Sequence, residues 1–267
     1  MTADPIIAAL ALPNDALVEL RVPKKLMLEQ GAPTPADKRA IQDGIEELIW
    51  VAALKPTNIG VPVFRDAVRE YLEIEVLALY LRPEAKVSRL VELVHRAIPY
   101  PVVLIARGGP PSSVNYGAAS AENAAAASFS VAHKRWSQGE TGQIVIEDVC
   151  STAPFRPDAP TTVEAAFLGR LALSGLLRGD LFATYQGWFD RIAALEAARI
   201  TGTFVVPGAT EQGAALKDGL AEYTRIEREL VGLRARAKKE KQVGRRVELN
   251  VAIKRLESEL ATIRGQL

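Results

Sequence analysis

The C-terminal region carries an apolar repeat that restricts it to helices packed along a narrow seam. In its last part, apolar residues recur at alternating gaps of four and three positions, at Leu249, Ile253, Leu256, Leu260, Ile263 and Leu267. The same spacing occurs upstream at Ile226, Leu230, Leu233 and Ala237. This heptad spacing is typical of coiled coils. The sequence therefore predicts either an antiparallel helical hairpin that turns near residues 238–244 or one long helix that forms a homodimer.

The predicted turn of this hairpin is strongly basic. Residues 234–246 hold seven Lys and Arg against a single Glu, a net charge of +6, whereas the whole chain carries a formal charge of +1. The seven cations are Arg234, Arg236, Lys238, Lys239, Lys241, Arg245 and Arg246. Clustered cations displace counterions from nucleic-acid phosphates without regard to base sequence, so these residues are predicted to bind nucleic acid. The solvated outer face of a coiled coil has a similar composition, and the sequence leaves that alternative open.

Residues 34–155 alternate between helical and strand-like patterns. Runs rich in β-branched, aromatic and aliphatic residues predict strands at 48–55, 71–81, 101–106, 127–134 and 143–150. Helical spacing predicts helices over 35–47 and 84–97. This order favours an α+β body in which a small mixed or antiparallel sheet is covered by helices.

The segments around this body have different patterns. Prolines divide residues 1–33, which we expect to form an extended N-terminal arm. Residues 156–209 are expected to be helical, with at most a short edge strand at 203–206. Residues 210–267 then form the basic coiled-coil hairpin. The Gly-, Pro-, Ser- and Ala-rich residues 107–126 are expected to be a mobile loop or a surface that orders against something else.

Cysteine usage and hydropathy exclude several classes of protein. The single cysteine, Cys150, cannot form an internal disulfide or a multi-cysteine zinc site. No apolar run reaches the roughly 18 residues that a membrane span needs, and the N-terminal segment lacks a basic region and a convincing cleavage pattern. We therefore expect a cytoplasmic protein that does not bind membranes. The sequence assigns it no metal, no cofactor and no catalytic residue.

If the protein is an enzyme, the alternative that we consider is a metal-dependent nuclease. Such a site holds Mg²⁺ between carboxylates on neighbouring strands and places a lysine beside the attacking water. Glu73 and Glu75 share one expected strand face, and Glu147 and Asp148 lie on another strand, but no lysine stands two residues after any of them. We interpret Glu73 and Glu75 as the solvated face of an amphipathic strand. Carboxylates that converge within reach of one metal ion would favour the nuclease instead.

The two histidines have structural interpretations. His95 lies in a helical pattern and is expected to be a partly buried packing or capping residue. His133 begins the run His133-Lys134-Arg135-Trp136 at a strand end, where cations and an aromatic ring could stack a base and hold phosphate. We favour a strand terminus at which Trp136 closes the core.

Residues 239–260 read KEKQVGRRVELNVAIKRLESEL. This stretch resembles the C-terminal signature of the bacterial domain-of-unknown-function 4391 family, Lys-Glu-Lys-Gln-Phe-Asn-Arg-Lys-Val-Glu-Leu-Asn before a leucine-spaced helix. The matching residues are Lys239, Glu240, Lys241, Gln242, Arg245, Val247, Glu248, Leu249 and Asn250. Val243 and Gly244 replace the Phe-Asn pair. Looser agreement elsewhere, such as Ala97-Ile98-Pro99-Tyr100 before a strand, extends the resemblance over nearly the whole chain.

The resemblance implies no established activity. It implies an association with superfamily-two helicases and DNA methyltransferases, because members of the family are often encoded beside them in loci resembling restriction or phage-defence systems. We therefore expect a non-catalytic accessory subunit that docks such a partner through Gln242, Glu248 and Asn250 and contacts DNA through the basic hairpin. The divergent nuclease and a homodimeric coiled-coil protein that binds no nucleic acid are the alternatives.

Overall fold

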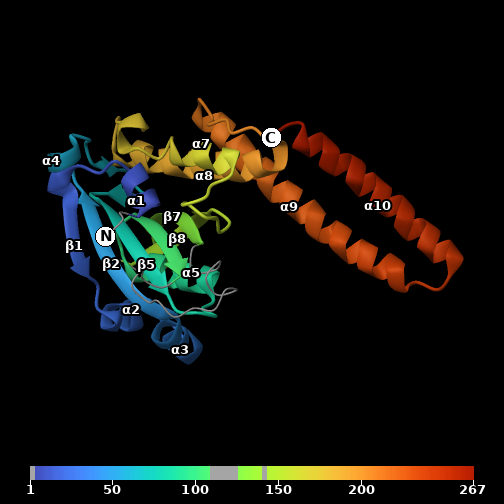
Figure 1. Cartoon of the computed structure of the whole chain (residues 1–267), viewed down its shortest axis with the longest axis horizontal. Coiled ribbons are helices and arrows are strands. Elements are labelled where there is room, and N and C mark those ends of the chain that lie inside the picture. The colour runs from blue at the N-terminus through green and yellow to red at the C-terminus, as the bar shows by residue number, and fades with distance from the viewer. Residues whose placement is uncertain (1–3, 109–125, 140–142) are drawn as a thin grey trace. The chain divides into compact units, whose positions relative to one another are not determined.

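The computed structural model describes residues 4–108, 126–139 and 143–267, and it confirms the α+β class (Figure 1). The chain folds as two compact units, Met1–Ile192 and Ala193–Leu267. The first unit contains the sheet and its covering helices, and the second contains a helical hairpin.

A six-stranded mixed sheet forms the centre of the first unit. Its strand order is β1 (Leu17–Arg21), β2 (Ile45–Leu54), β5 (Ile74–Leu81), β6 (Val102–Gly108), β7 (Ala127–Trp136) and β8 (Ile144–Ser151). β5 and β6 are parallel and the other neighbours are antiparallel. The parallel pair requires a crossover, which α5 (Val87–Ala97) supplies. A separate ribbon pairs β3 (Phe64–Arg65) with β4 (Glu70–Tyr71).

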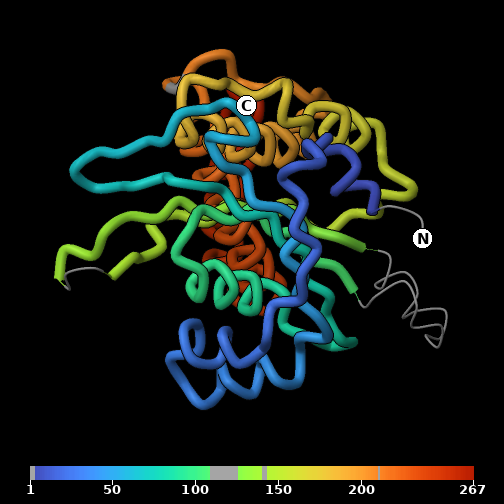
Figure 2. The backbone as a smooth tube through the Cα atoms, turned by 90° about the vertical axis from the view of Figure 1, so that its left-hand side faces the viewer, coloured from blue at the N-terminus to red at the C-terminus, as the bar shows by residue number. Residues whose placement is uncertain are grey.

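Helices cover both faces of the sheet (Figure 2). One face carries α2 (Lys24–Gln30), α3 (Pro35–Gly44) and α5, whose apolar side chains pack with those of the strands around Leu77 and Leu104. The other face carries α1 (Pro5–Ala9), α7 (Thr162–Leu168) and the part of α8 (Leu181–Thr201) that belongs to the first unit. The short elements are η1 (Asn14–Ala16), α4 (Pro56–Ile59) and η2 (Leu173–Gly175). Because both faces are covered, the central strand β5 is buried along nearly its whole length.

The helix α3 begins as predicted and ends three residues early. Thr34 is its N-cap and accepts a hydrogen bond from the Asp37 amide at 3.2 Å, with Pro35 in the first turn. We predicted that the helix would reach Glu47, but it ends at Gly44. A Cβ atom on Gly44 would lie 2.7 Å from Leu90 Cδ1, so α5 packs closely against the end of α3. The chain turns into β2 directly after it.

The N-terminal segment differs from the extended arm that we expected. Residues 4–33 contain α1, β1 and α2, and Ile6, Leu10 and Met27 are buried. Their apolar side chains complete the core on both faces of the sheet, while β1 adds an edge strand to β2. Three other segments can be compared with the sequence analysis. Thr203–Val206 forms no strand, and Cys150 is half-buried on β8. Most of the 107–126 stretch lies outside the described residues.

The second unit contains two long antiparallel helices, α9 (Thr210–Lys239) and α10 (Val243–Arg264) (Figure 1). Glu240–Gln242 joins them, as the hairpin alternative predicted. The apolar seam residues of α10 are half-buried, whereas the valines outside the seam are exposed. Arg234 on α9 and Glu257 on α10 form an ion pair with a 2.7 Å N–O distance. Among the described residues, no helix combines the length and apolarity needed to cross a membrane.

Candidate functional site

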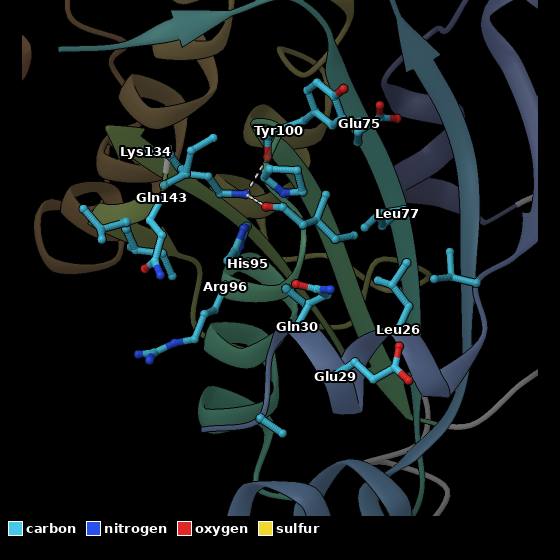
Figure 3. Close-up of a pocket in the computed structure, with 18 of the residues that line it drawn as sticks. Leu26, Glu29, Gln30, Glu75, Leu77, His95, Arg96, Tyr100, Lys134 and Gln143 are labelled. Carbon is cyan, nitrogen blue, oxygen red and sulfur yellow. Dashed lines mark hydrogen bonds between the residues drawn. The ribbon is translucent and has the colours of Figure 1, made fainter. Parts of the chain in front are cut away.

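A pocket of about 1010 Å³ lies on the sheet face that α2 and α5 cover (Figure 3). Its walls are mainly apolar, from α2, α5, the strands and the loop before β6. Its apolar lining includes Val22, Leu26, Trp50, Leu77, Ile98, Pro99, Ile144 and Ile146. Glu73, Glu75, His95, Tyr100 and Lys134 bring polar groups to the same space. A pocket of this size with apolar walls and few polar groups is typical of small-molecule sites.

The carboxyl group of Glu75 is the most unusual group in this pocket. Glu75 points to the same sheet face as Leu77, and the residue is only 4% exposed. Its Oε2 atom is buried and has no hydrogen-bond partner among the described residues. Burial, helped by the neighbouring Glu73 carboxylate, raises the pKa of Glu75 to about 7. The prediction that Glu75 lies on a solvated strand face is therefore wrong, because α2 and α5 cover that face of β5.

Glu73 precedes β5 and is held differently. Its carboxylate forms an ion pair with Lys55, with 3.1 Å between Lys55 Nζ and Glu73 Oε2. This contact raises the pKa of Lys55. Glu73 therefore has a counter-charge in the folded chain, while one oxygen of Glu75 has no partner among the described residues.

Lys134 brings a buried amine to the pocket from β7. Its ammonium group donates hydrogen bonds to the backbone carbonyls of Ile98, at 2.6 Å, and Tyr100 (Figure 3). Ile98 is the C-cap of α5, so the amine lies at the negative end of that helix dipole. Burial lowers the pKa of Lys134 to about 7, and the Glu75 carboxylate opposes this shift.

His95 is a third buried ionisable residue on this face. It is completely buried on α5, and its Nε2 lies 2.8 Å from Ser130 Oγ on β7. Its Nδ1 has no hydrogen-bond partner among the described residues. Burial, together with the Lys134 charge, lowers the pKa of His95 well below its usual value, so the imidazole is neutral. The expectation of a packing histidine agrees with this placement.

These groups can bind a polar ligand and exchange protons near neutral pH. An acid and an amine that both titrate near pH 7 are suited to either role. Within the described part of the chain, no group of three or more His, Cys, Asp and Glu residues could hold a metal ion.

The burial of Glu75 predicts a pH-dependent cost to stability. Its folded-state pKa of about 7 exceeds its ordinary value of 4.5, so the native state keeps a proton that the unfolded chain releases. This group by itself lowers the free energy of unfolding as pH rises from about 5 to about 8, whereas the lowered pKa values of His95, His133 and Lys134 contribute in the opposite direction, so the comparison of variants isolates Glu75. Between these two pH values, we expect the free energy of unfolding of Glu75→Gln to fall by about 2 kcal/mol less than that of native protein, because glutamine does not titrate.

Urea unfolding at both pH values measures this difference. Glu29→Gln is the control, because Glu29 is exposed at the pocket rim and pairs with Lys25 at 3.7 Å. Parallel pH dependence in native protein and Glu75→Gln would contradict the assignment.

The run from His133 to Trp136 does not form one cationic cluster. His133 and Lys134 point to opposite faces of β7, since side chains alternate along a strand. On the α8 face, His133 Nδ1 lies 2.5 Å from Tyr71 Oη and Nε2 lies 2.8 Å from Gln186 Oε1. Its ring stacks on Phe189 at 4.0 Å, and its burial lowers its pKa to about 4. His133 is therefore a buried neutral packing residue.

The carboxylates expected on two strands are separated. Glu147 on β8 accepts hydrogen bonds of 2.7 to 2.9 Å from the Arg69 guanidinium. Neither Glu147 nor Asp148 lines the pocket that contains Glu73 and Glu75. The four carboxylates named for the nuclease alternative therefore do not share that pocket.

The predicted nucleic-acid-binding residues surround the turn between α9 and α10. We call them the hairpin tip: Arg234, Arg236, Lys238, Lys239, Lys241, Arg245 and Arg246. All seven are exposed. Arg234 pairs with Glu257, and within the described residues the other six make no ion pair. The structure thus gathers these cations on one turn.

The residues expected to contact a partner lie beside the tip. Gln242 is the N-cap of α10, and Glu248 and Asn250 are exposed on that helix. Next to them is an exposed stripe of three valines at four-residue spacing, at Val243, Val247 and Val251. This stripe lies outside the seam that packs on α9.

Sequence reasoning missed the pocket because its members come from separate elements. The search for a lysine two residues after a glutamate could not find Lys134, which approaches from β7. One signal was present, because Ser128, Ser130 and Lys134 alternate with apolar residues on that strand. This alternation places Lys134 on the same face as Ser130.

Comparison with known proteins supports the family resemblance. A search of curated proteins and a search of solved structures each found no match. A family model described as a domain of unknown function, DUF4391, matches residues 10–260. This range includes the sheet, the pocket and nearly all of the hairpin. The chain therefore belongs to the DUF4391 family.

Proposed function

We propose that this protein is a non-catalytic accessory subunit of a bacterial DNA-processing or defence complex. In this proposal the hairpin tip contacts DNA, and the adjacent surface of α10 docks a helicase or methyltransferase partner. The observation that carries the proposal is the exposed cluster of cations around one turn.

The tip combines cations with free helix amides. Arg245 and Arg246 lie in the first turn of α10, which has no acidic residue, and its N-cap makes no side-chain hydrogen bond to the helix. Cations at a helix N-terminus are unfavourable because they face the positive end of the dipole. A phosphate group bound there would offset that repulsion and accept hydrogen bonds from the amides. This arrangement supports binding of a phosphate backbone.

The cations of the hairpin tip lie far from the other end of the hairpin, because the two helices are long. The 30 residues of α9 extend about 45 Å at the usual helical rise. Exposed cations at the end of such a helix pair bind through charge and not through base edges, so little sequence specificity is expected.

The partner-docking part rests on the valine stripe and its polar neighbours. Exposed apolar side chains beside fixed polar groups are common in protein interfaces. Gln242, Glu248 and Asn250 would flank the contact. A Val247→Asn change, which adds no charge beside the tip, should then weaken copurification of the helicase or methyltransferase without weakening DNA binding.

A salt titration tests the DNA contact. Binding of a labelled duplex is measured at several salt concentrations for native protein and for a variant with Lys238, Lys239, Lys241, Arg245 and Arg246 changed to alanine. We expect the slope of log K against log salt to become flatter by about 4, since each phosphate contact contributes about 0.9.

The matched control removes five exposed cations away from the turn. It changes Lys217, Arg228, Lys254, Arg255 and Arg264 to alanine in the same unit. This control should keep most of the native slope. Equal slopes in all three proteins, or weak binding by all three, would remove DNA from the proposal and leave partner docking as the role of the hairpin.

A further inference from the structure

The pocket on the sheet face covered by α2 and α5 has no role in the function proposed for the hairpin. Its volume of about 1010 Å³ is sufficient for a small organic molecule, and it lies wholly within the first unit. Its apolar walls favour a ligand with an apolar body.

One oxygen of a deep carboxyl group in this pocket lacks a partner, although the same group interacts with the Trp50 indole and the Glu73 side chain. Glu75 is 4% exposed, and its Oε2 atom has no hydrogen bond among the described residues. A buried carboxylate oxygen without a donor is unfavourable in an apolar environment. A ligand N–H group at this position would remove that cost.

The surrounding charges favour a cationic donor. Lys55 pairs with Glu73, and the Lys134 ammonium already donates to two backbone carbonyls. The titratable and charged groups facing Glu75 or lining its pocket are Glu73, Lys55, Lys134, His95, Tyr100, Glu29 and Arg96. His95 is neutral, and the cations have other partners or lie near the rim. Lys134 and Lys55 therefore act on the Glu75 charge, but among the described residues no cation forms an ion pair with it.

The aromatic wall favours a flat ligand group. Trp50 lies on β2 opposite Leu77 on β5, and its indole N–H donates to Ala52 O at 3.1 Å. Its ring lines the pocket that also contains Glu75. A planar cation can pair with a carboxylate through two N–H groups and pack its face on an indole ring.

We propose that this pocket binds a small molecule that carries an amidinium or guanidinium group, with the cation on Glu75 and the apolar body against Trp50 and Leu77. The site requires no residue of the hairpin, so it stands or fails independently of DNA binding.

Benzamidine is the probe, and benzamide is its neutral counterpart of nearly the same shape. A ligand of this size is expected to bind native protein with a Kd of about 1 mM. Calorimetric titration of the full-length chain should show benzamide binding at least about tenfold more weakly, because it lacks the charge.

Two variants assign the contact. Glu75→Gln keeps the side-chain shape and should weaken benzamidine binding at least about tenfold, whereas Glu84→Gln, at an exposed position outside the pocket lining, should change it less than about twofold. Urea unfolding of both variants confirms that they are folded. Equal affinity of Glu75→Gln and native protein would overturn the proposal, as would no native binding at ten times the expected Kd.

The pH dependence gives an independent readout. Benzamidine stays cationic near neutral pH, so its affinity should rise at least about tenfold from about pH 6 to about pH 8, as Glu75 ionises and Lys134 loses its charge. Binding to ordinary surface carboxylates would not change in this range. A flat profile, or benzamide binding as tightly as benzamidine, would overturn the cationic assignment.

Discussion

Replacing Trp188 by alanine is expected to lower the free energy of unfolding by about 4 kcal/mol, the largest effect that we predict for one residue. Trp188 lies on α8 and is completely buried in the first unit. Its indole N–H donates a hydrogen bond to Leu171 O at 3.1 Å, and its ring meets Tyr185 edge-on at 6.4 Å. Alanine would leave a large cavity and an unpaired carbonyl, so both packing and hydrogen bonding are lost.

Urea unfolding monitored by circular dichroism measures this loss. Leu177→Ala is the matched control, because Leu177 is 73% exposed and its truncation should cost less than about 0.5 kcal/mol. A loss below about 1 kcal/mol in Trp188→Ala would show that α8 does not contribute to the cooperative core of the first unit.

The elements with strong periodicity could be predicted from the sequence. The predicted strand at 127–134 and helix at 84–97 correspond to β7 and α5, and the heptad seam predicted the two helices of the hairpin. Each pattern reflects which side chains face a neighbouring element, so it is present in the local sequence. The family resemblance likewise came from the contiguous residues 239–260, and a family model that matches residues 10–260 confirms it.

The pocket could not be predicted in this way, because burial depends on elements far apart in the chain. The alternation around Glu75 is the same whether its strand face is wet or covered. Only the packing of α2 and α5 over the sheet shows that it is covered. The N-terminal residues 4–33 were similarly misjudged, since short apolar segments between prolines gain stability only from packing on the sheet. The position of Lys134 beside Ile98 also requires the strand order, which local patterns do not contain.

Replacing Tyr185 by phenylalanine is expected to lower the free energy of unfolding by about 3 kcal/mol, although it removes one oxygen atom. The Tyr185 hydroxyl accepts a hydrogen bond from the Ala132 amide at 2.8 Å and donates one to Val102 O at 2.6 Å. It lies where the ladder between β6 and β7 ends, just beyond the pair Val103 and Val131. Burial raises the pKa of Tyr185 well above its ordinary value, so the hydroxyl keeps its proton and can donate.

The expected loss comes from two backbone groups that phenylalanine cannot satisfy. Each buried group left without a partner costs about 1 to 3 kcal/mol. Tyr223→Phe is the matched control, because it removes the same atom from a half-buried position on α9 and should cost less than about 0.5 kcal/mol. Chemical denaturation of both variants at the same pH gives the comparison. If Tyr185→Phe loses no more than the control, the hydroxyl does not stabilise the end of this ladder, and the junction of β6 and β7 must be held by packing around the ring alone.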